Sequence, residues 1–180
     1  MPATPHDITG FWRAAGPKKW FAKNPNFDAA IQLKFEPVHY MAALGRHDKW
    51  MESAEGSLAL LILLDQFPRN LWRGTGHAFA TDGKARLIAR RAVAIGQDLE
   101  IEPLLRPFVY LPFEHSEDMA DQDEAVRLCA ALGDPETLKY AELHRDIIAR
   151  FGRFPHRNVC LGRTTTPEEQ QFLDEGGFAG

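Results

Sequence analysis

Two copies of one short motif bring together side chains that can bind an anion. The first copy runs from Phe67 to Asn70 as Phe-Pro-Arg-Asn, and the second runs from Phe154 to Asn158 as Phe-Pro-His-Arg-Asn. In each copy the proline stops a preceding helix, the arginine offers a planar fork of donors, and the asparagine can bond free backbone groups. An arginine fixed in this way at a helix end can hold a carboxylate or an anionic ligand.

Several polar residues lie on helix faces that are otherwise apolar. His144 falls on the same face as Tyr140, Ile147 and Phe151, so we expect it to be buried beside an acid, either Asp65 or one of the polar groups between positions 114 and 122. The others are Asp65, Gln66, His115 and Gln122. A buried polar group without a partner costs about 1–3 kcal/mol. These side chains should therefore bond to one another or to a ligand.

Two interpretations of the polar residues remain open. In one, they form a structural network in which arginines tie helix ends together. In the other, they line a pocket that binds an anion. The predicted ligand-binding residues are Gln66, Arg69, Asn70, Gln122, Arg153, His156, Arg157 and Asn158.

The pattern favours a binding module with a buried polar pocket or groove for an anionic small molecule or an acidic peptide. The alternative is a hydrolase or lyase that uses His115 or His144 as the base, oriented by Glu117 or Asp65. A third possibility is a tetratricopeptide-like protein-interaction domain in which the polar network is purely structural. The sequence shows no exposed aromatic-rich stripe to favour this third function.

The sequence lacks the residues that other kinds of functional site require. Glu36 and His39 have the Glu-x-x-His spacing of di-iron bundles, but that site needs a second copy and none is present. Gly-rich phosphate loops and a Gly-x-Ser-x-Gly elbow are also absent. We therefore predict no metal site and no cofactor, and the question of catalysis stays open.

Composition limits the location and the partners. The chain has 180 residues, and its net charge of -4 argues against a nucleic-acid partner. The longest apolar run, at residues 58–64, is far too short to span a membrane, and the N-terminal residues do not resemble a signal peptide. We predict a cytoplasmic protein that contacts neither nucleic acid nor membrane.

The hydrophobic periodicity predicts helices throughout. Helical patterns cover residues 27–44, 57–66, 82–95, 114–132 and 136–151, and Pro37 should bend or split the first of these. No segment alternates with period two, so no sheet is expected. The prediction is an all-α single domain over residues 1–180, with roughly eight or nine helices of about 11–12 residues in a bundle or short α-solenoid.

Longer motifs resemble a known family. They include Leu63–Asn70 with Ala78–Asp82, Pro112–Glu117 with Asp121-Gln122, and Phe151–Asn158. These segments are similar to the bacterial domain-of-unknown-function family 924 over residues of about 11–173. The resemblance implies a bacterial protein with an all-helical, tetratricopeptide-like fold, and it implies no established activity.

Overall fold

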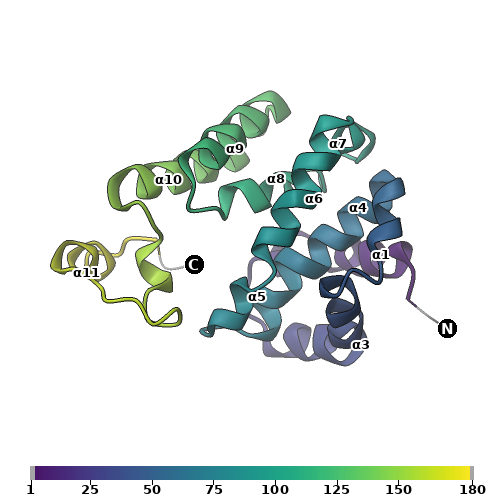
Figure 1. Ribbon diagram of the computed structural model, residues 1–180, viewed down its shortest axis with the longest axis horizontal. Coiled ribbons are helices and arrows are strands. Elements are labelled where there is room, and N and C mark those ends of the chain that lie inside the picture. Colours follow the sequence, from purple (N-terminus) through teal and green to yellow (C-terminus); the bar gives the residue numbers. More distant parts are fainter. Residues whose placement is uncertain (1–2, 179–180) are drawn as a thin grey trace. The chain divides into compact units, whose positions relative to one another are not determined.

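The computed structural model describes residues 3–178, which form helices and contain no strand (Figure 1). The all-α fold class is therefore confirmed over these residues. The chain divides into two compact units. The first contains the residues up to Arg73 together with His77–Pro112, and the second contains Gly74–Gly76 and the residues from Phe113 onward. The tetratricopeptide-like label stays a prediction.

The first unit is built around a fully apolar segment. Its elements are α1 (Pro5–Ala15), α2 (Pro17–Trp20), α3 (Pro25–Ala43), η1 (Asp48–Glu52), α4 (Ala54–Leu61), η2 (Ile62–Gln66), α5 (Phe67–Leu71), α6 (Asp82–Ala94) and α7 (Gln97–Glu100). Helix α4 packs against α1 and α6, and α3 packs against α5 and η2. Residues 58–64 are almost completely buried, as their continuous hydrophobicity predicts.

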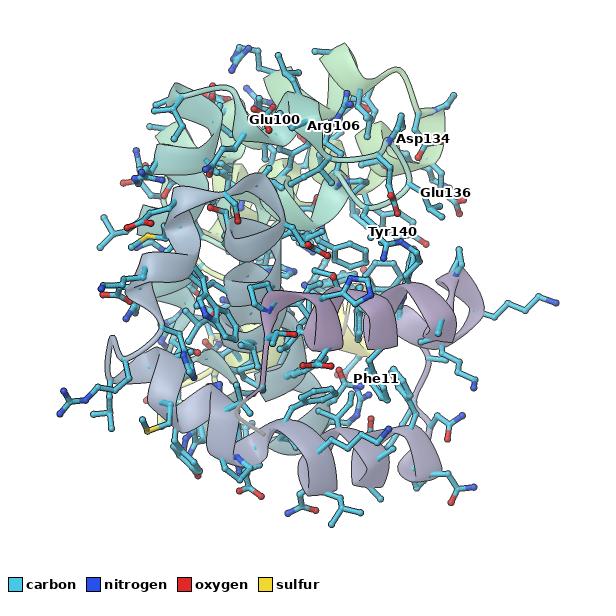
Figure 2. All side chains as sticks on the ribbon, turned by 90° about the vertical axis from the view of Figure 1, so that its right-hand side faces the viewer. Phe11, Glu100, Arg106, Asp134, Glu136 and Tyr140 are labelled. Atoms are coloured by element: carbon cyan, nitrogen blue, oxygen red, sulfur yellow. The ribbon has the colours of Figure 1, made fainter. Side chains whose placement is uncertain are left out.

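Aromatic rings fill the space between α1 and α3. Phe11 points from α1 toward α3 (Figure 2), where its ring stacks on Phe27 at a centroid distance of 5.4 Å. Trp12 is fully buried and meets Phe67 at 5.7 Å. Offset and edge contacts of this kind add to the stabilisation that burial alone provides. The inward face of α3 is thereby fixed against the core.

Helix α3 is continuous through Pro37, which contradicts a split at that residue. Pro37 is exposed, so its ring faces solvent rather than the core. The backbone hydrogen bond that it cannot donate is missing on the solvent side of the helix. The helix begins at an Asn24 cap whose side chain accepts hydrogen bonds from the backbone N–H groups of Asn26 and Phe27. The helix therefore continues although the backbone hydrogen bond from residue 37 is missing.

The second unit is a helix pair followed by irregular structure. Its elements are the end of α8 (Pro107–Glu114), then α9 (Met119–Leu132), α10 (Pro135–Phe151), η4 (Pro155–Arg157) and α11 (Pro167–Asp174). A short segment, η3 (Gly76–Phe79), crosses the boundary between the units. Helices α9 and α10 pack side by side (Figure 1). Ile147 and Ile148 of α10 form a buried cluster with Phe154. The last helix begins with a capping box, in which Thr166 and Glu169 bond each other's backbone.

Two predictions about helix boundaries are wrong. Residues 114–132 do not form one helix, because Asp118 caps α9 and the hydroxyl of Ser116 accepts a hydrogen bond from the Asp118 N–H group. The described residues also contain more helical segments than eight or nine, because single turns such as α2 and α7 are separated by proline and glycine. His115 and Glu117 consequently lie in a loop rather than on a helix.

Candidate functional site

The predicted site residues belong to both units. Asp65, Gln66, Arg69 and Asn70 lie in the first unit. The second unit contains His115, Glu117, Gln122, His144, Arg153, His156, Arg157 and Asn158.

In the first unit, the motif follows a π-helical segment that the sequence analysis did not predict. In η2 the N–H of Phe67 bonds to Ile62 O, five residues back, and Pro68 has no N–H to continue the pattern. Three backbone carbonyls of this segment accept hydrogen bonds from side chains. His39 donates to Leu63 O at 2.8 Å, Thr81 donates to Leu64 O, and Arg69 donates to Asp65 O at 2.6 Å. His39 thus has a structural role at this segment.

Arg69 holds carboxylates of its own chain. Its two terminal nitrogens each lie 2.9 Å from an oxygen of Asp82, and Nη1 lies 3.3 Å from Asp65 Oδ1. Burial alone would lower the pKa of Arg69, but the Asp65 and Asp82 carboxylates outweigh it and raise the pKa. Gln66 also donates to Asp65, at 2.6 Å. These contacts connect η2 and α5 to the first turn of α6.

Asn70 and the neighbouring Arg73 converge on one further carboxylate. The Asn70 amide donates to Asp28 Oδ1 at 2.7 Å, and Arg73 donates to both Asp28 oxygens at 3.0 and 3.1 Å. Asp28 lies in the first turn of α3, where the helix dipole also favours a negative charge.

The second motif repeats this arrangement. Arg153 donates to the two oxygens of Glu169 at 2.6 and 2.8 Å, and the amide of Asn158 donates to Glu169 Oε2 at 3.1 Å. Glu169 lies in the first turn of α11. The Arg153 guanidinium lowers the pKa of Glu169 to about 2, aided by the Thr166 backbone N–H, although burial opposes the shift. In both cases, then, the motif asparagine and an arginine that flanks the motif, Arg73 or Arg153, hold a carboxylate at the start of another helix.

His144 is buried and lies beside an acid, as predicted. Its Nδ1 lies 3.1 Å from Glu114 Oε1 and 2.8 Å from Tyr140 O. The ring of His115 lies 6.4 Å away, centroid to centroid. The structure therefore brings His144 together with Glu114 and His115 within the second unit.

The buried amide of Gln122 is oriented by two backbone carbonyls. Its Nε2 donates to Glu114 O at 2.7 Å and to Ser116 O at 2.6 Å. Its Oε1 is buried and has no hydrogen-bond partner among residues 3–178, and the same is true of Asn158 Oδ1. Two acceptors therefore point into the protein interior without a donor from the described part of the chain.

Glu117 pairs with Arg163, a residue that the sequence analysis did not single out. The two guanidinium nitrogens lie 2.8 Å from the two carboxylate oxygens, and the Phe154 N–H donates to Glu117 at 3.0 Å. Burial would raise the pKa of Glu117, but Arg163 and the Phe154 N–H outweigh it and lower the pKa. Both residues lie in loops, where hydrophobic periodicity carries no information about contacts.

Arg157 and His156 contact Phe154 of their own motif. The guanidinium carbon of Arg157 lies 4.3 Å from the centroid of the Phe154 ring, and Nη1 donates to His115 O at 3.0 Å. The His156 ring lies 5.6 Å from the same phenyl ring. The second motif thus packs around its aromatic residue.

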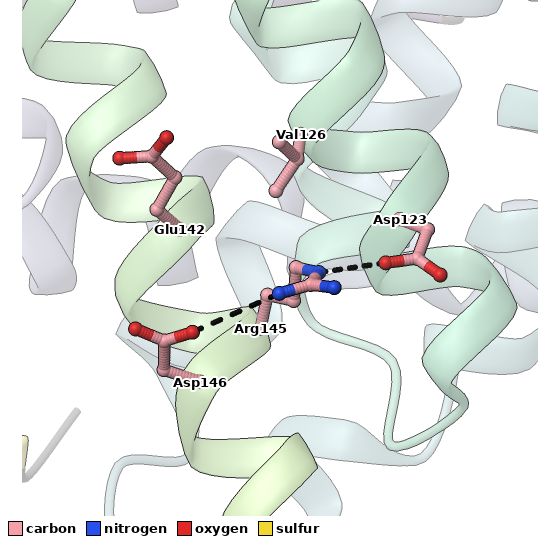
Figure 3. Close-up of a pocket in the computed structure, with 5 residues that line it drawn as sticks. All are labelled: Asp123, Val126, Glu142, Arg145 and Asp146. Atoms are coloured by element: carbon pink, nitrogen blue, oxygen red, sulfur yellow. Dashed lines mark hydrogen bonds and ion pairs between the residues drawn. The ribbon is translucent and has the colours of Figure 1, made fainter.

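A surface hollow between α9 and α10 is lined by none of the predicted residues (Figure 3). Arg145 crosses it, with Nε 2.6 Å from Asp123 Oδ1 and Nη1 3.9 Å from Asp146 Oδ1. Val126 and Glu142 complete its lining. All four charged side chains stand at the surface, and such pairs contribute about 0–1 kcal/mol.

A more unusual feature is the outer face of α3, which we define as Ala29, Leu33, Pro37, Tyr40, Met41 and Leu44. All six residues are exposed: Leu33 to 84%, Leu44 to 74%, Met41 to 43% and Tyr40 to 42%. Positions 33, 37, 40 and 44 follow the 4-3-4 spacing of a helix-packing seam. The sequence contains this spacing, but α3 has a second apolar stripe on its inward face, which obscured it.

Within residues 3–178 we find no group of three or more His, Cys, Asp or Glu side chains arranged to hold a metal ion. None of the helices in this range has the length and hydropathy of a membrane span.

Over residues 3–178, the fold and the motifs define a strand-free helical protein in which arginine and asparagine side chains clamp carboxylates at helix starts. The chain belongs to the family of bacterial proteins of unknown function DUF924, which matches residues 8–177. This confirms the resemblance seen in the motifs.

A solved structure is similar over almost the whole chain. It is that of the protein of unknown function ATU0120 from Agrobacterium tumefaciens, with 52% sequence identity and a TM-score of 0.93 over 96% of this chain and 97% of that chain. A search of curated proteins finds no match.

Proposed function

We propose that this protein is an interaction module that binds an acidic amphipathic helix of a partner protein on the outer face of α3. The observation that carries the proposal is the continuous exposure of apolar side chains along that face. Single exposed apolar residues are common on protein surfaces, but a contiguous apolar patch marks an interaction site.

The spacing of the outer face suits a helical partner. The stretch from Ala29 to Leu44 covers about four helical turns, or about 22 Å at 1.5 Å per residue. Side chains at i, i+4, i+7 and i+11 can interdigitate with a helix of the same length. Tyr40 lies 5.8 Å from the Trp72 ring, which itself stacks on the exposed His77 at 4.1 Å. These rings extend the apolar surface at one end with residues that are favoured in interfaces.

The charges around the face favour an acidic partner. The exposed basic residues Lys23, Lys34 and Arg46 lie on or beside α3. The acidic residues of α3 are Asp28, which is held by Arg73, and the half-buried Glu36. This edge is basic although the whole chain has a net charge of -4. A second copy of the chain would bring two basic edges together, which complementarity disfavours. Acidic side chains that flank the apolar residues of a partner helix would instead pair with Lys23, Lys34 and Arg46.

The contacts of Arg69 and Arg153 support this function over binding of a free anion. Arg69 and Arg153 are each occupied by carboxylates of the same chain. Binding of an anionic small molecule by the motif residues stays a second candidate. The buried oxygens of Gln122 and Asn158 would accept hydrogen bonds from N–H or O–H groups of such a molecule or from ordered water; because they are acceptors, they would not bind its anionic group.

Selection from a displayed library of helical 16-residue peptides tests the proposal. The library is panned against the parent protein and counter-selected against a Leu33→Ser/Leu44→Ser variant. We expect enriched peptides with apolar residues at 3–4 spacing and Glu or Asp beside them. Enrichment of Lys-rich or Arg-rich helices, or of peptides that bind the variant equally well, contradicts the proposal.

A cytoplasmic location, like the absence of a nucleic-acid partner, stays a prediction.

A further inference from the structure

The last described residues fold back onto the second unit. The N–H of Gly176 donates to Leu173 O at 3.2 Å, and the N–H of Gly177 donates to Phe172 O at 2.9 Å. Gly176 has a φ of 83°, and a Cβ on Gly177 would lie 2.5 Å from both Phe172 O and the Phe172 ring. Glycine at these two positions therefore permits a tight turn that side chains would prevent. We call residues 175–178 the strap.

The strap places an aromatic ring on two histidines. The Phe178 ring lies 4.5 Å from the His144 ring and 5.4 Å from the His156 ring, in edge-to-face geometry with both. It also packs against the cluster of Ile147, Ile148 and Phe154. Within the second unit, Phe178 thus covers the imidazole that pairs with Glu114.

The strap is attached by few interactions. Among the described residues, three backbone hydrogen bonds, one side-chain bond between Gln171 and Glu175 and the packing of one phenyl ring hold it, and Glu175 and Gly176 are exposed. Segments with few buried contacts open locally at a small fraction of the free energy of global unfolding. The His144–Glu114 pair beneath Phe178 is attached more firmly than the strap, because both residues are buried and are held by helices α10 and α8.

We propose that the strap is a lid that opens without unfolding of the second unit and admits small solutes to the His144–Glu114 pair. A buried acid beside an imidazole can bind a polar solute or exchange a proton with it. Opening replaces the contacts of Phe178 with solvent and leaves the packing of α9 on α10 intact. Access to the pair is then set by the strap rather than by the stability of the unit.

Chemical modification of His144 tests the lid. Diethyl pyrocarbonate is the probe for His144, and iodoacetamide is the probe for Cys129, with both rates followed by peptide mass spectrometry. Cys129 is buried in α9, and burial raises the pKa of its thiol to about 12, so it reacts when the unit itself opens. We expect Phe178→Ala to raise the rate at His144 about tenfold or more, while the rate at Cys129 changes less than about twofold.

A second variant leaves Phe178 in place. Gly177→Ala should displace the strap, because the new Cβ meets Phe172, and it should raise the rate at His144 in the same way. If Cys129 accelerates in parallel with His144 in both variants, Phe178 is a core residue of the unit and the proposal is wrong. If His144 accelerates in neither variant, the strap does not control access and the proposal is equally wrong.

Discussion

His144 and Glu114 form a buried acid–imidazole pair, with 3.1 Å between Nδ1 and Oε1 and side-chain exposures of 6% and 4%. The Tyr140 carbonyl lies 2.8 Å from the same nitrogen, so Nδ1 carries a proton that both oxygens can accept. The pair joins the end of α8 to the middle of α10. Its contribution to stability depends on filling the space as well as on the hydrogen bond.

Replacement of His144 should separate these two effects. His144→Leu refills most of the volume but removes the partner of Glu114, whereas His144→Ala also leaves a cavity. Both variants should lose about 1–4 kcal/mol of unfolding free energy, with alanine losing more. Urea titrations followed by circular dichroism measure the difference. Equal unfolding free energies of both variants and the parent would show that the pair contributes nothing to stability.

Glu169 should make the protein sensitive to acid. Its pKa is about 2 in the folded state, below the ordinary value of 4.5, so its stabilising contribution is present above pH 4.5 and is lost as the pH falls toward 2. The loss should reach up to about 3 kcal/mol, at 1.36 kcal/mol per pKa unit. Glu169→Gln should flatten the decline of unfolding free energy in this window.

The neighbouring residue provides the matched control for that measurement. Glu168 is 66% exposed and pairs with an Arg150 that is 52% exposed. Glu168→Gln should therefore leave the decline of unfolding free energy between pH 4.5 and 2 unchanged. A parent protein whose stability does not fall between pH 4.5 and 2, or a Glu168→Gln variant that behaves like Glu169→Gln, would disagree with the geometry of the second motif.

Two glycines in helices should respond to alanine in opposite directions. A Cβ on Gly56, in α4, would lie 2.0 Å from the Trp50 carbonyl oxygen, and backbone cannot move aside cheaply. Gly83, in α6, has open space around it, and alanine there removes the helix penalty of glycine. We expect Gly56→Ala to destabilise by about 1–3 kcal/mol and Gly83→Ala to stabilise by about 0.5–1 kcal/mol. Thermal melts that move both variants in one direction would exclude this packing at Trp50.

Pro37 should be a site at which stability can be gained. It is exposed inside α3, where it removes a hydrogen bond to the carbonyl of Leu33 and buries nothing in exchange. Pro37→Ala should raise the unfolding free energy by about 1–3 kcal/mol and keep the outer face apolar. Differential scanning calorimetry that finds a lower melting temperature would mean that proline supports the helix at this position.

Periodicity predicted the inward-facing residues better than the contacts between them. His144 was placed correctly because its neighbours on one helical face are apolar, and Gln122 is buried for the same reason. The pairing of Glu117 with Arg163 could not be predicted, because it joins two loops that only the tertiary fold brings together. The outer face of α3 was missed because two apolar stripes on one helix leave little amphipathic contrast. The motif arginines are expected from the sequence to hold anions, and Arg69 does hold Asp82. In the second motif Arg157 instead donates to His115 O, and Arg153, just before the motif, holds Glu169.

The most direct test of the interaction module is the affinity of one selected acidic helical peptide, measured by fluorescence anisotropy, for three proteins. These are the parent, the Leu33→Ser/Leu44→Ser variant and a Leu87→Ser control, in which a leucine of comparable exposure, 69%, is changed on α6. We predict that the double variant weakens binding at least tenfold, which corresponds to about 1.4 kcal/mol, and that Leu87→Ser binds like the parent. Equal affinity of all three proteins for the peptide would contradict a docking face on α3.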